Sequence, residues 1–383
     1  MEITIDRQYL HSKVDIVKGI TKHKSLLAVT RSVLIELDGE HGKISATDLE
    51  TSAISGLKGS NSDESLTIVV PAGTLSDILA SIGDQEITLA VRDGENVLKI
   101  EQGRVEIGLA LMDPEEFPDI EVLNDTEAFR IPAKDILRGI GKVLYAVSVD
   151  EKRFILTGVL MQAKDGEFRM CATDGYRLAL LKIEIPDIPD SPQIVIPGRN
   201  IKLLREILDE NATVGVVINE AKVQFMTSQA TIIFRTLQAA YPAYESILAS
   251  TGTYNIAFAK RLPFLECLRR MAPLGTKNDW VKLTRTSPGG LTVRMESEKG
   301  YAQETIDCEF KSDTEFDFAF NLKYLLDAVE HIDSDQLVIR YPGAYGVVVL
   351  DSVDYICGVM PIRTTGDWTP IEQQAKASGG KDE

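Results

Sequence analysis

Residues 170–180 read MCATDGYRLAL, and this stretch is the most informative about the architecture of the chain. Two apolar, strand-like runs flank the dipeptide Asp174-Gly175, which is typical of a tight hairpin because glycine tolerates a positive φ angle. Residues 44–54 read ISATDLETSAI, so the tripeptide Ala-Thr-Asp occurs at 46–48 and again at 172–174, 126 positions apart. One Asp-Gly pair is an ordinary surface turn. A turn that recurs together with its flanking strands predicts an internal repeat.

Two helical patterns accompany the strands of each repeat and keep nearly the same spacing. The first begins near residues 6, 131 and 259, and its first copy has an apolar face made of Leu10, Val14, Val17 and Ile20. The second begins near residues 71, 197 and 321, and we expect residues 197–208 to form one helix. The sequence therefore predicts three similar α+β domains of ordinary size, at residues 1–125, 126–253 and 254–363.

The last twenty residues, 364–383, read TTGDWTPIEQQAKASGGKDE. They are polar and show little periodicity, which is typical of a disordered tail. We therefore expect the folded part of the chain to close at the strand-like GVMPIR of residues 358–363.

Composition limits the class of protein. The 383 residues carry a net charge of −17, and this average opposes nucleic-acid binding, which needs lysine and arginine. Four isolated cysteines, with no C-x-x-C pair, predict neither a metal site nor a disulfide framework, and they favour a reducing cytoplasm. No apolar run approaches the ~18 residues of a membrane span, and the N-terminus lacks a signal pattern. We expect a cytoplasmic protein.

The first helix of each repeat departs from this acidic average. Residues 6–22, 132–146 and 259–274 carry net charges of +2, +2 and +3. Lys134, Arg138 and Lys142 share one face of the second of these helices, and the 197–208 segment repeats the pattern with Arg199, Lys202 and Arg205. One such helix is an ordinary solvated face. Four at related places predict a surface that holds a polyanion by its backbone, without reading bases.

Known catalytic motifs are missing from the sequence. It contains no G-x-x-x-x-G-K-[ST] loop, no G-x-S-x-G elbow, no H-E-x-x-H and no G-x-G-x-x-G. The acidic turn at 113–119 lacks the ligand spacing of a calcium loop. The pattern favours a binding or scaffolding role without catalytic residues, metal or cofactor.

Four segments, in this order, carry a family resemblance: ATDGYRLAL at 172–180, AAYPAYESIL at 239–248, FNLKYLLDA at 320–328 and VMPIR at 359–363. With the threefold repeat, residues 1–363 resemble the bacterial DNA polymerase III β subunits, the sliding clamps. The resemblance implies a DNA clamp fold of three similar domains. Two subunits would form a head-to-tail ring, with helices lining the inside and antiparallel sheets on the outside. Such a ring would encircle duplex DNA and tether the polymerase for processive synthesis, without catalysis.

The resemblance also implies a hydrophobic pocket between the second and third domains. There the polymerase catalytic subunit, the clamp loader and other proteins with a clamp-binding motif would dock a short peptide. By motif, its walls would be Leu156, Thr173, Gly175, Tyr176, Arg177, Leu178, Pro242, Ile247, Asn321, Tyr324, Val359, Met360, Pro361, Ile362 and Arg363. Arg177 and Arg363 would offer hydrogen-bond donors to peptide carbonyls.

Two further sets of residues complete the expected sites. The cations expected to face DNA are Lys13, Lys22, Lys24, Arg138, Lys142, Lys152, Arg153, Arg199, Lys202 and Arg205. The residues expected at the subunit interface are Val105, Ile107, Leu109, Met271 and Leu274. The alternation through 105–111 describes an interface edge and a core-facing strand equally well.

The chain departs from the usual pattern of the family at three places. Tyr176 stands where many members have histidine, Ser246 stands where a basic residue is frequent, and the chain continues 20 residues past Arg363. One hypothesis is that this tail lies across the pocket and competes weakly, so that deletion of 364–383 tightens peptide binding.

Two other classes of protein remain as alternatives. An enzyme acting on sugars or phosphates in a basic cleft would require a catalytic constellation. A scaffold that binds only peptides would not require basic helices in register. Subunit count, together with binding to circular and to linear DNA, separates these alternatives from a clamp.

Overall fold

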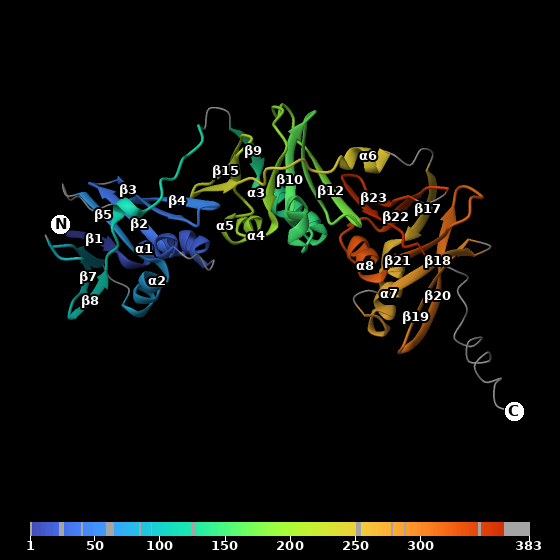
Figure 1. The fold of residues 1–383 in the computed structure, drawn as a ribbon, viewed down its shortest axis with the longest axis horizontal. Coiled ribbons are helices and arrows are strands. Elements are labelled where there is room, and N and C mark those ends of the chain that lie inside the picture. Colours follow the sequence, from blue (N-terminus) through green and yellow to red (C-terminus); the bar gives the residue numbers. More distant parts are fainter. Residues whose placement is uncertain are drawn as a thin grey trace. The chain divides into compact units, whose positions relative to one another are not determined.

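The computed structural model describes residues 2–22, 27–39, 41–58, 65–83, 86–92, 94–124, 128–249, 254–276, 279–286, 289–343 and 346–363. The expected joints near 125 and 253, and the tail, lie outside these residues. The chain divides into two compact units (Figure 1). Unit 1 comprises Met1–Gly175 and Ala179–Pro242, and unit 2 comprises Tyr176–Leu178 and Ala243–Glu383.

The first part of unit 1 holds two helices and eight strands. They are β1 (Glu2–Asp6), α1 (Arg7–Lys18), β2 (Ser32–Asp38), β3 (His41–Thr47), β4 (Thr51–Lys58), β5 (Ser65–Pro71), α2 (Ala72–Ser81), β6 (Glu86–Ala90), β7 (Val97–Gln102) and β8 (Val105–Ala110). The Asp6 carboxylate accepts a hydrogen bond from the Tyr9 amide at 2.6 Å, which caps α1 at its N-terminus. The predicted apolar face of α1 is confirmed, since Leu10, Val14 and Val17 are fully buried. α1 packs against α2.

The second part of unit 1 repeats this order. Its elements are β9 (Phe129–Pro132), α3 (Ala133–Val143), the 3₁₀ segment η6 (Glu151–Thr157), β10 (Gly158–Lys164), β11 (Glu167–Thr173), β12 (Arg177–Glu184), β13 (Ile194–Pro197), α4 (Gly198–Ile201), α5 (Leu204–Ile207), β14 (Thr213–Ile218), β15 (Lys222–Met226) and β16 (Thr231–Arg235). Strands β10 to β13 form one sheet in the order β13-β10-β11-β12.

The prediction of one helix over 197–208 is wrong. The structure has two short helices, α4 and α5, joined by Lys202 and Leu203. The backbone tightens at this joint, because the amide of Leu203 donates to the carbonyl of Asn200 and that of Arg205 donates to Lys202, each three residues back.

One continuous sheet joins the two parts of unit 1. Its eight strands run β5-β2-β3-β4-β16-β15-β14-β9, and β4 pairs with β16 in antiparallel register from Thr51↔Phe234 to Ile54↔Thr231. The first part adds a second sheet in the order β1-β6-β7-β8. Because backbone hydrogen bonds cross from one part to the other, the two form a single compact unit.

Unit 2 has the same kinds of elements. They are α6 (Tyr244–Ala249), β17 (Asn255–Lys260), α7 (Arg261–Met271), β18 (Trp280–Thr286), β19 (Gly290–Ser297), β20 (Gly300–Phe310), β21 (Asp317–Asn321), α8 (Leu322–Glu330), β22 (Gln336–Tyr341), β23 (Val348–Asp351) and β24 (Tyr355–Val359). Its strands follow the order β24-β23-β22-β17-β20-β19-β18-β21, and α7 packs against α8. Phe316 packs edge-on against Tyr341 in the core, with ring centroids 4.8 Å apart.

Candidate nucleic-acid and peptide interfaces

The cations of α1 have local partners. Lys13 Nζ donates to Ser55 Oγ at 3.2 Å and lies 5.6 Å from the centre of the Tyr9 ring. Lys18 lies 2.9 Å from Asp15. Hydrogen bonds from Lys18 and Ser76, with the charges of Lys18 and His11, hold the Asp15 pKa below its usual value despite partial burial. The expected Lys24 and the side chain of Lys22 lie outside the described residues.

The face of α3 opposite its apolar residues carries the predicted cations. Ile136, Ile140 and Val143 are fully buried, so they form the core face of this helix. Lys134 is exposed, and Arg138 and Lys142, at the next turns of this helix, are half-buried. The amphipathic pattern therefore orients α3 as the sequence predicts.

The cations of α7 are paired with carboxylates. Arg269 lies 2.5 Å from Glu330 on α8. Arg270 donates two hydrogen bonds to Glu304 on β20, at 2.5 and 2.9 Å. These hydrogen bonds are the main reason that the Glu304 pKa lies below its usual value. The most positive helix of the sequence therefore has much of its charge offset inside unit 2.

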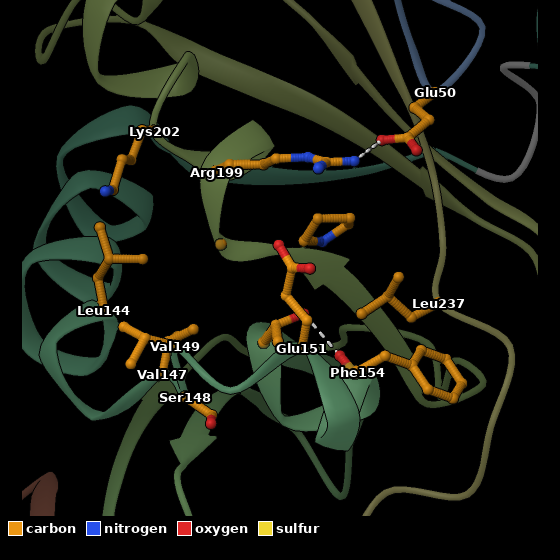
Figure 2. Close-up of a pocket in the computed structure, with 13 residues that line it drawn as sticks. Glu50, Leu144, Val147, Ser148, Val149, Glu151, Phe154, Arg199, Lys202 and Leu237 are labelled. Carbon is orange, nitrogen blue, oxygen red and sulfur yellow. Dashed lines mark hydrogen bonds and ion pairs between the residues drawn. The ribbon is translucent and has the colours of Figure 1, made fainter.

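A cavity of about 540 Å³ in unit 1 contains two of the predicted DNA-facing cations (Figure 2). Arg199 and Lys202 line it, and Arg199 forms an ion pair with Glu50 from the turn between β3 and β4. Val149 and Phe154 are 92% and 49% exposed on its other side. Cations on such a surface suit contact with the phosphate backbone of a nucleic acid.

The remaining predicted cations of this part lie around the same region. Lys152 and Arg153 belong to η6, whose residues 151 and 154 line the cavity. Arg153 lies 3.4 Å from Asp150. Arg205 is exposed on α5. The elements η6, α4 and α5 thus gather several cations that are separated by about 50 positions in the sequence.

Unit 2 carries an exposed apolar patch at residues predicted to bind peptide. Its members are 36–55% exposed: Tyr176, Ile247, Met360 and Ile362. The Tyr176 ring stacks on Tyr324 with centroids 6.3 Å apart. Two backbone hydrogen bonds hold the 359–363 segment, from Met360 to the Tyr176 carbonyl at 2.8 Å and from Ile362 to the Ala319 carbonyl at 2.7 Å.

Arg177, which the resemblance implied as a donor to peptide carbonyls, is nearly buried in unit 2. Only 9% of this residue is exposed, its Nη1 donates to Asp327 at 2.5 Å, and its guanidinium lies 4.5 Å from the centre of the Tyr324 ring. The side chain therefore supports Tyr324 from within unit 2. Sequence reasoning missed Asp327 because the two residues lie 150 positions apart.

The other expected pocket residues have mixed positions. Asn321 caps α8, since its Oδ1 accepts from the Tyr324 amide at 3.1 Å. Leu178 and Val359 are buried in the core, so they support the surface from below. Pro361 is half-buried and Arg363 is exposed in the segment that carries Met360 and Ile362. Leu156, Thr173, Gly175 and Pro242 belong to unit 1.

The expected interface residues fall into three groups by exposure. Leu109 is 7% exposed and Met271 is 1% exposed, so both are buried within their own units, and their contact with a second subunit stays a prediction. Val105 is 43% exposed on β8, the last strand of its sheet. Ile107 and Leu274 are half-buried.

A second strand edge was missed by the sequence reasoning. Residues 300–307 of β20 pair with β19, whereas β17 pairs with this strand only from Cys308 onward. Among the described strands, this stretch of β20 therefore has a ladder on one side alone, and Tyr301 on it is 59% exposed. Its weak alternation, YAQETID, gave no signal for such an edge.

The described part of the chain holds no arrangement of side chains suited to a metal ion. No group of three or more His, Cys, Asp or Glu residues there is arranged to hold a metal ion. All four cysteines are free and buried, and burial raises the pKa of the Cys267 and Cys308 thiols to about 12. Within the described ranges, every helix is too short or too polar to cross a bilayer.

Successive repeats of paired helices on antiparallel sheets define a protein of the DNA clamp class. Models of the N-terminal, central and C-terminal domains of the DNA polymerase III beta subunit match residues 1–121, 130–243 and 250–355. The chain belongs to this family, the bacterial β sliding clamps, as the resemblance predicted. Family members are processivity factors in DNA replication and not catalytic enzymes, which confirms the predicted non-enzymatic role.

Known relatives align over almost the whole chain. The beta sliding clamp of Halalkalibacterium halodurans is 27% identical over 381 residues, covering 95% of this chain and all of the relative. The crystal structure of the Pseudomonas aeruginosa DNA polymerase III subunit beta superposes with a TM-score of 0.86 at 26% identity. The Bacillus subtilis sliding clamp gives 0.86 at 25% identity, and both structures cover 95% of this chain and are themselves covered completely.

Proposed function

We propose that this chain is the processivity clamp of a replicative DNA polymerase. Two copies form a head-to-tail ring around duplex DNA, in the cytoplasm, and hold the polymerase catalytic subunit on its template. Membership of the sliding-clamp family is the observation that carries this proposal. The basic helices resolve the apparent conflict with a net charge of −17, because enclosure requires only a weak attraction that ignores sequence.

The subunit contact joins β8 of one copy to β20 of the other. β8 and residues 300–307 of β20 are edges among the described strands, and unpaired edges form antiparallel pairs readily. Val105 and Ile107 supply apolar contacts from one copy, and Leu274 and Tyr301 supply them from its partner. A contact between two different surfaces closes into a ring when the rotation between copies is suitable.

Partner proteins dock a short peptide on the apolar patch of unit 2. Tyr176, Met360 and Ile362 offer exposed apolar area, and the ring of Tyr324 packs against the Tyr176 ring and supports it. Aliphatic and aromatic anchors suit such a surface. The polymerase catalytic subunit and the clamp loader are the partners that this function requires.

A primer-extension assay tests this proposal. The chain is added to its own polymerase and clamp loader on singly primed circular single-stranded DNA. Full-length products within one binding event are expected only when the chain is present. Met360→Glu, which places a charge in the patch, is expected to abolish the long products, whereas Val353→Glu, at another exposed apolar position of unit 2, leaves them unchanged. Short products with the unmodified chain would contradict the proposal.

A further inference from the structure

Two turns of the molecule, one in each of the first two repeats, have the same backbone geometry. Leu49, in the turn after β3, has a φ angle of 76°, and Gly175, 126 positions later in the turn after β11, has a φ angle of 87°. In the first turn the amide of residue 49 donates to Thr47 Oγ1 at 3.1 Å, and in the second the amide of residue 175 donates to Thr173 Oγ1 at 3.0 Å. We call them the Leu49 turn and the Gly175 turn.

The backbone that follows each turn is also held in the same way. The Glu50 carbonyl accepts from the Arg235 amide at 2.8 Å, and the Tyr176 carbonyl accepts from the Met360 amide at 2.8 Å. Glu50 is therefore the counterpart of Tyr176, and Arg235 is the counterpart of Met360. The surroundings of the Leu49 turn thus correspond to the apolar patch of unit 2.

The strand register extends this correspondence to a third position. Lys222 pairs with Arg235 between β15 and β16. Val348 pairs with Val359 between β23 and β24, so Val347 stands one step further along, opposite Met360. Lys222 in the first repeat therefore corresponds to Val347 in unit 2, which is only 5% exposed.

The Leu49 turn borders a cavity of about 190 Å³ within unit 1, small for a ligand site. Its lining includes Leu49, Glu50, Lys222, Arg235 and Glu121. Lys222 donates to Glu121 at 2.5 Å, and charges occupy the positions whose counterparts are Tyr176, Val347 and Met360. An apolar peptide anchor here would remove water from these charges, which is unfavourable.

Leu49 is also an unusual choice for its backbone conformation. A positive φ angle brings the Cβ of an L-residue close to its own backbone, so glycine is the ordinary occupant, as in the Gly175 turn. Leu49 keeps this conformation and is 44% exposed at the cavity. At the corresponding Gly175, an added Cβ would lie 2.9 Å from Nη1 of Arg153, so a side chain at that position would meet Arg153.

We infer that the Leu49 turn is a peptide site closed by its own side chains. Leu49, Glu50, Lys222 and Arg235 are specificity-determining residues that direct partner peptides to the Gly175 turn. Rejection at one of two related sites is a form of discrimination by repulsion. The inference rests on the proposed peptide binding at Tyr176, Met360 and Ile362.

Calorimetric titration tests the inference with the full chain. The probe is an acetylated pentapeptide, Gly-Leu-Ser-Leu-Phe, which carries aliphatic and aromatic anchors. The unmodified chain is expected to bind one peptide per subunit. The variant Leu49→Gly/Glu50→Tyr/Lys222→Val/Arg235→Met, which copies the residues of the second site, is expected to bind two. Adding Tyr176→Glu/Met360→Glu to this variant is expected to leave one.

The outcomes separate this inference from the proposed function. One peptide per subunit in the fourfold variant, with an unchanged circular dichroism spectrum and melting temperature, overturns the inference and leaves the proposed site intact. No peptide on the unmodified chain but one on the fourfold variant overturns the proposed site and supports closure of the Leu49 turn.

A second variant tests the same inference if the fourfold variant does not fold. Leu49→Gly/Arg235→Met changes only two side chains, and a benzophenone-labelled form of the same peptide is crosslinked to it by light. Crosslinks to residues 47–52, found by mass spectrometry and missing from the unmodified chain, support the inference. Crosslinks confined to the surroundings of residue 176 overturn it.

Discussion

Helix α7 and the α4–α5 segment occupy related repeats and carry similar charges, yet they present them differently. On α7, Arg269 and Arg270 form ion pairs with Glu330 and Glu304 at 2.5 Å. On α4–α5, Lys202 and Arg205 are exposed and have no carboxylate partner among the described residues. Net charge along a helix therefore does not measure the charge that is available to a phosphate.

The largest effect is expected at α4–α5. Lys202→Glu/Arg205→Glu should weaken binding to a fluorescent 30-base-pair duplex by about 100-fold at low salt, because two phosphate contacts become repulsive. Fluorescence anisotropy across a salt series measures this loss and the accompanying fall in salt dependence.

A matched control keeps the change in net charge and moves it elsewhere in unit 1. Lys43→Glu/Lys58→Glu alters two exposed lysines on β3 and β4. This control is expected to change the affinity by less than about threefold, through long-range charge alone. Equal losses in the two variants would show that the location of the charge does not matter.

A smaller effect is expected at α7, because its arginines are already paired. Arg269→Ala/Arg270→Ala should lower the duplex affinity by about twofold and leave the slope of affinity against salt nearly unchanged. A tenfold loss in the same anisotropy assay would show that these arginines leave their carboxylates to bind DNA.

Removing the carboxylate that pairs with an arginine of α7 should have the opposite effect on DNA affinity. Glu304→Gln removes the carboxylate that holds Arg270, so the duplex should bind about twofold more tightly at low salt. Glu298→Gln, at another exposed acidic position of unit 2, changes the net charge equally and serves as the control. Identical affinities for the two variants would contradict a masking role for Glu304.

The smallest effect concerns pH. Since the Glu304 pKa is lowered in the folded chain, its contribution to stability is complete above the unfolded pKa, and it is lost as the pH falls through the folded value. The melting temperature of the unmodified chain should therefore fall slightly more than that of Glu304→Gln between pH 6 and pH 3. Parallel curves from scanning calorimetry would contradict this linkage.

Local patterns in the sequence were sufficient to predict the repeats, the buried face of α1 and the turn at Gly175. Each depends on residues that lie within a few positions of one another, where spacing and φ preference act directly. Leu49 and Gly175 lie 126 positions apart, the same separation as the repeated Ala-Thr-Asp, so the sequence indicates that they are equivalent. The positive φ angle of Leu49 could not be predicted, because leucine rarely adopts it.

Contacts between distant residues could not be predicted in this way. The pairing of Arg177 with Asp327 and the burial of Met271 depend on how helices and strands pack. The pairing of β4 with β16 and the edge of β20 depend on which strands meet. Alternation in one strand reveals which side chains share a face, but not whether that face meets a core or a partner.

In the proposed function, the protein holds DNA by enclosing it. The most direct measurement loads the chain with its clamp loader onto a nicked circular plasmid, removes free protein by gel filtration, and then cuts the plasmid once with a restriction enzyme. Two copies are expected to stay on each occupied circle for minutes and to leave within seconds of cutting. Equal retention on circular and linear DNA would contradict enclosure.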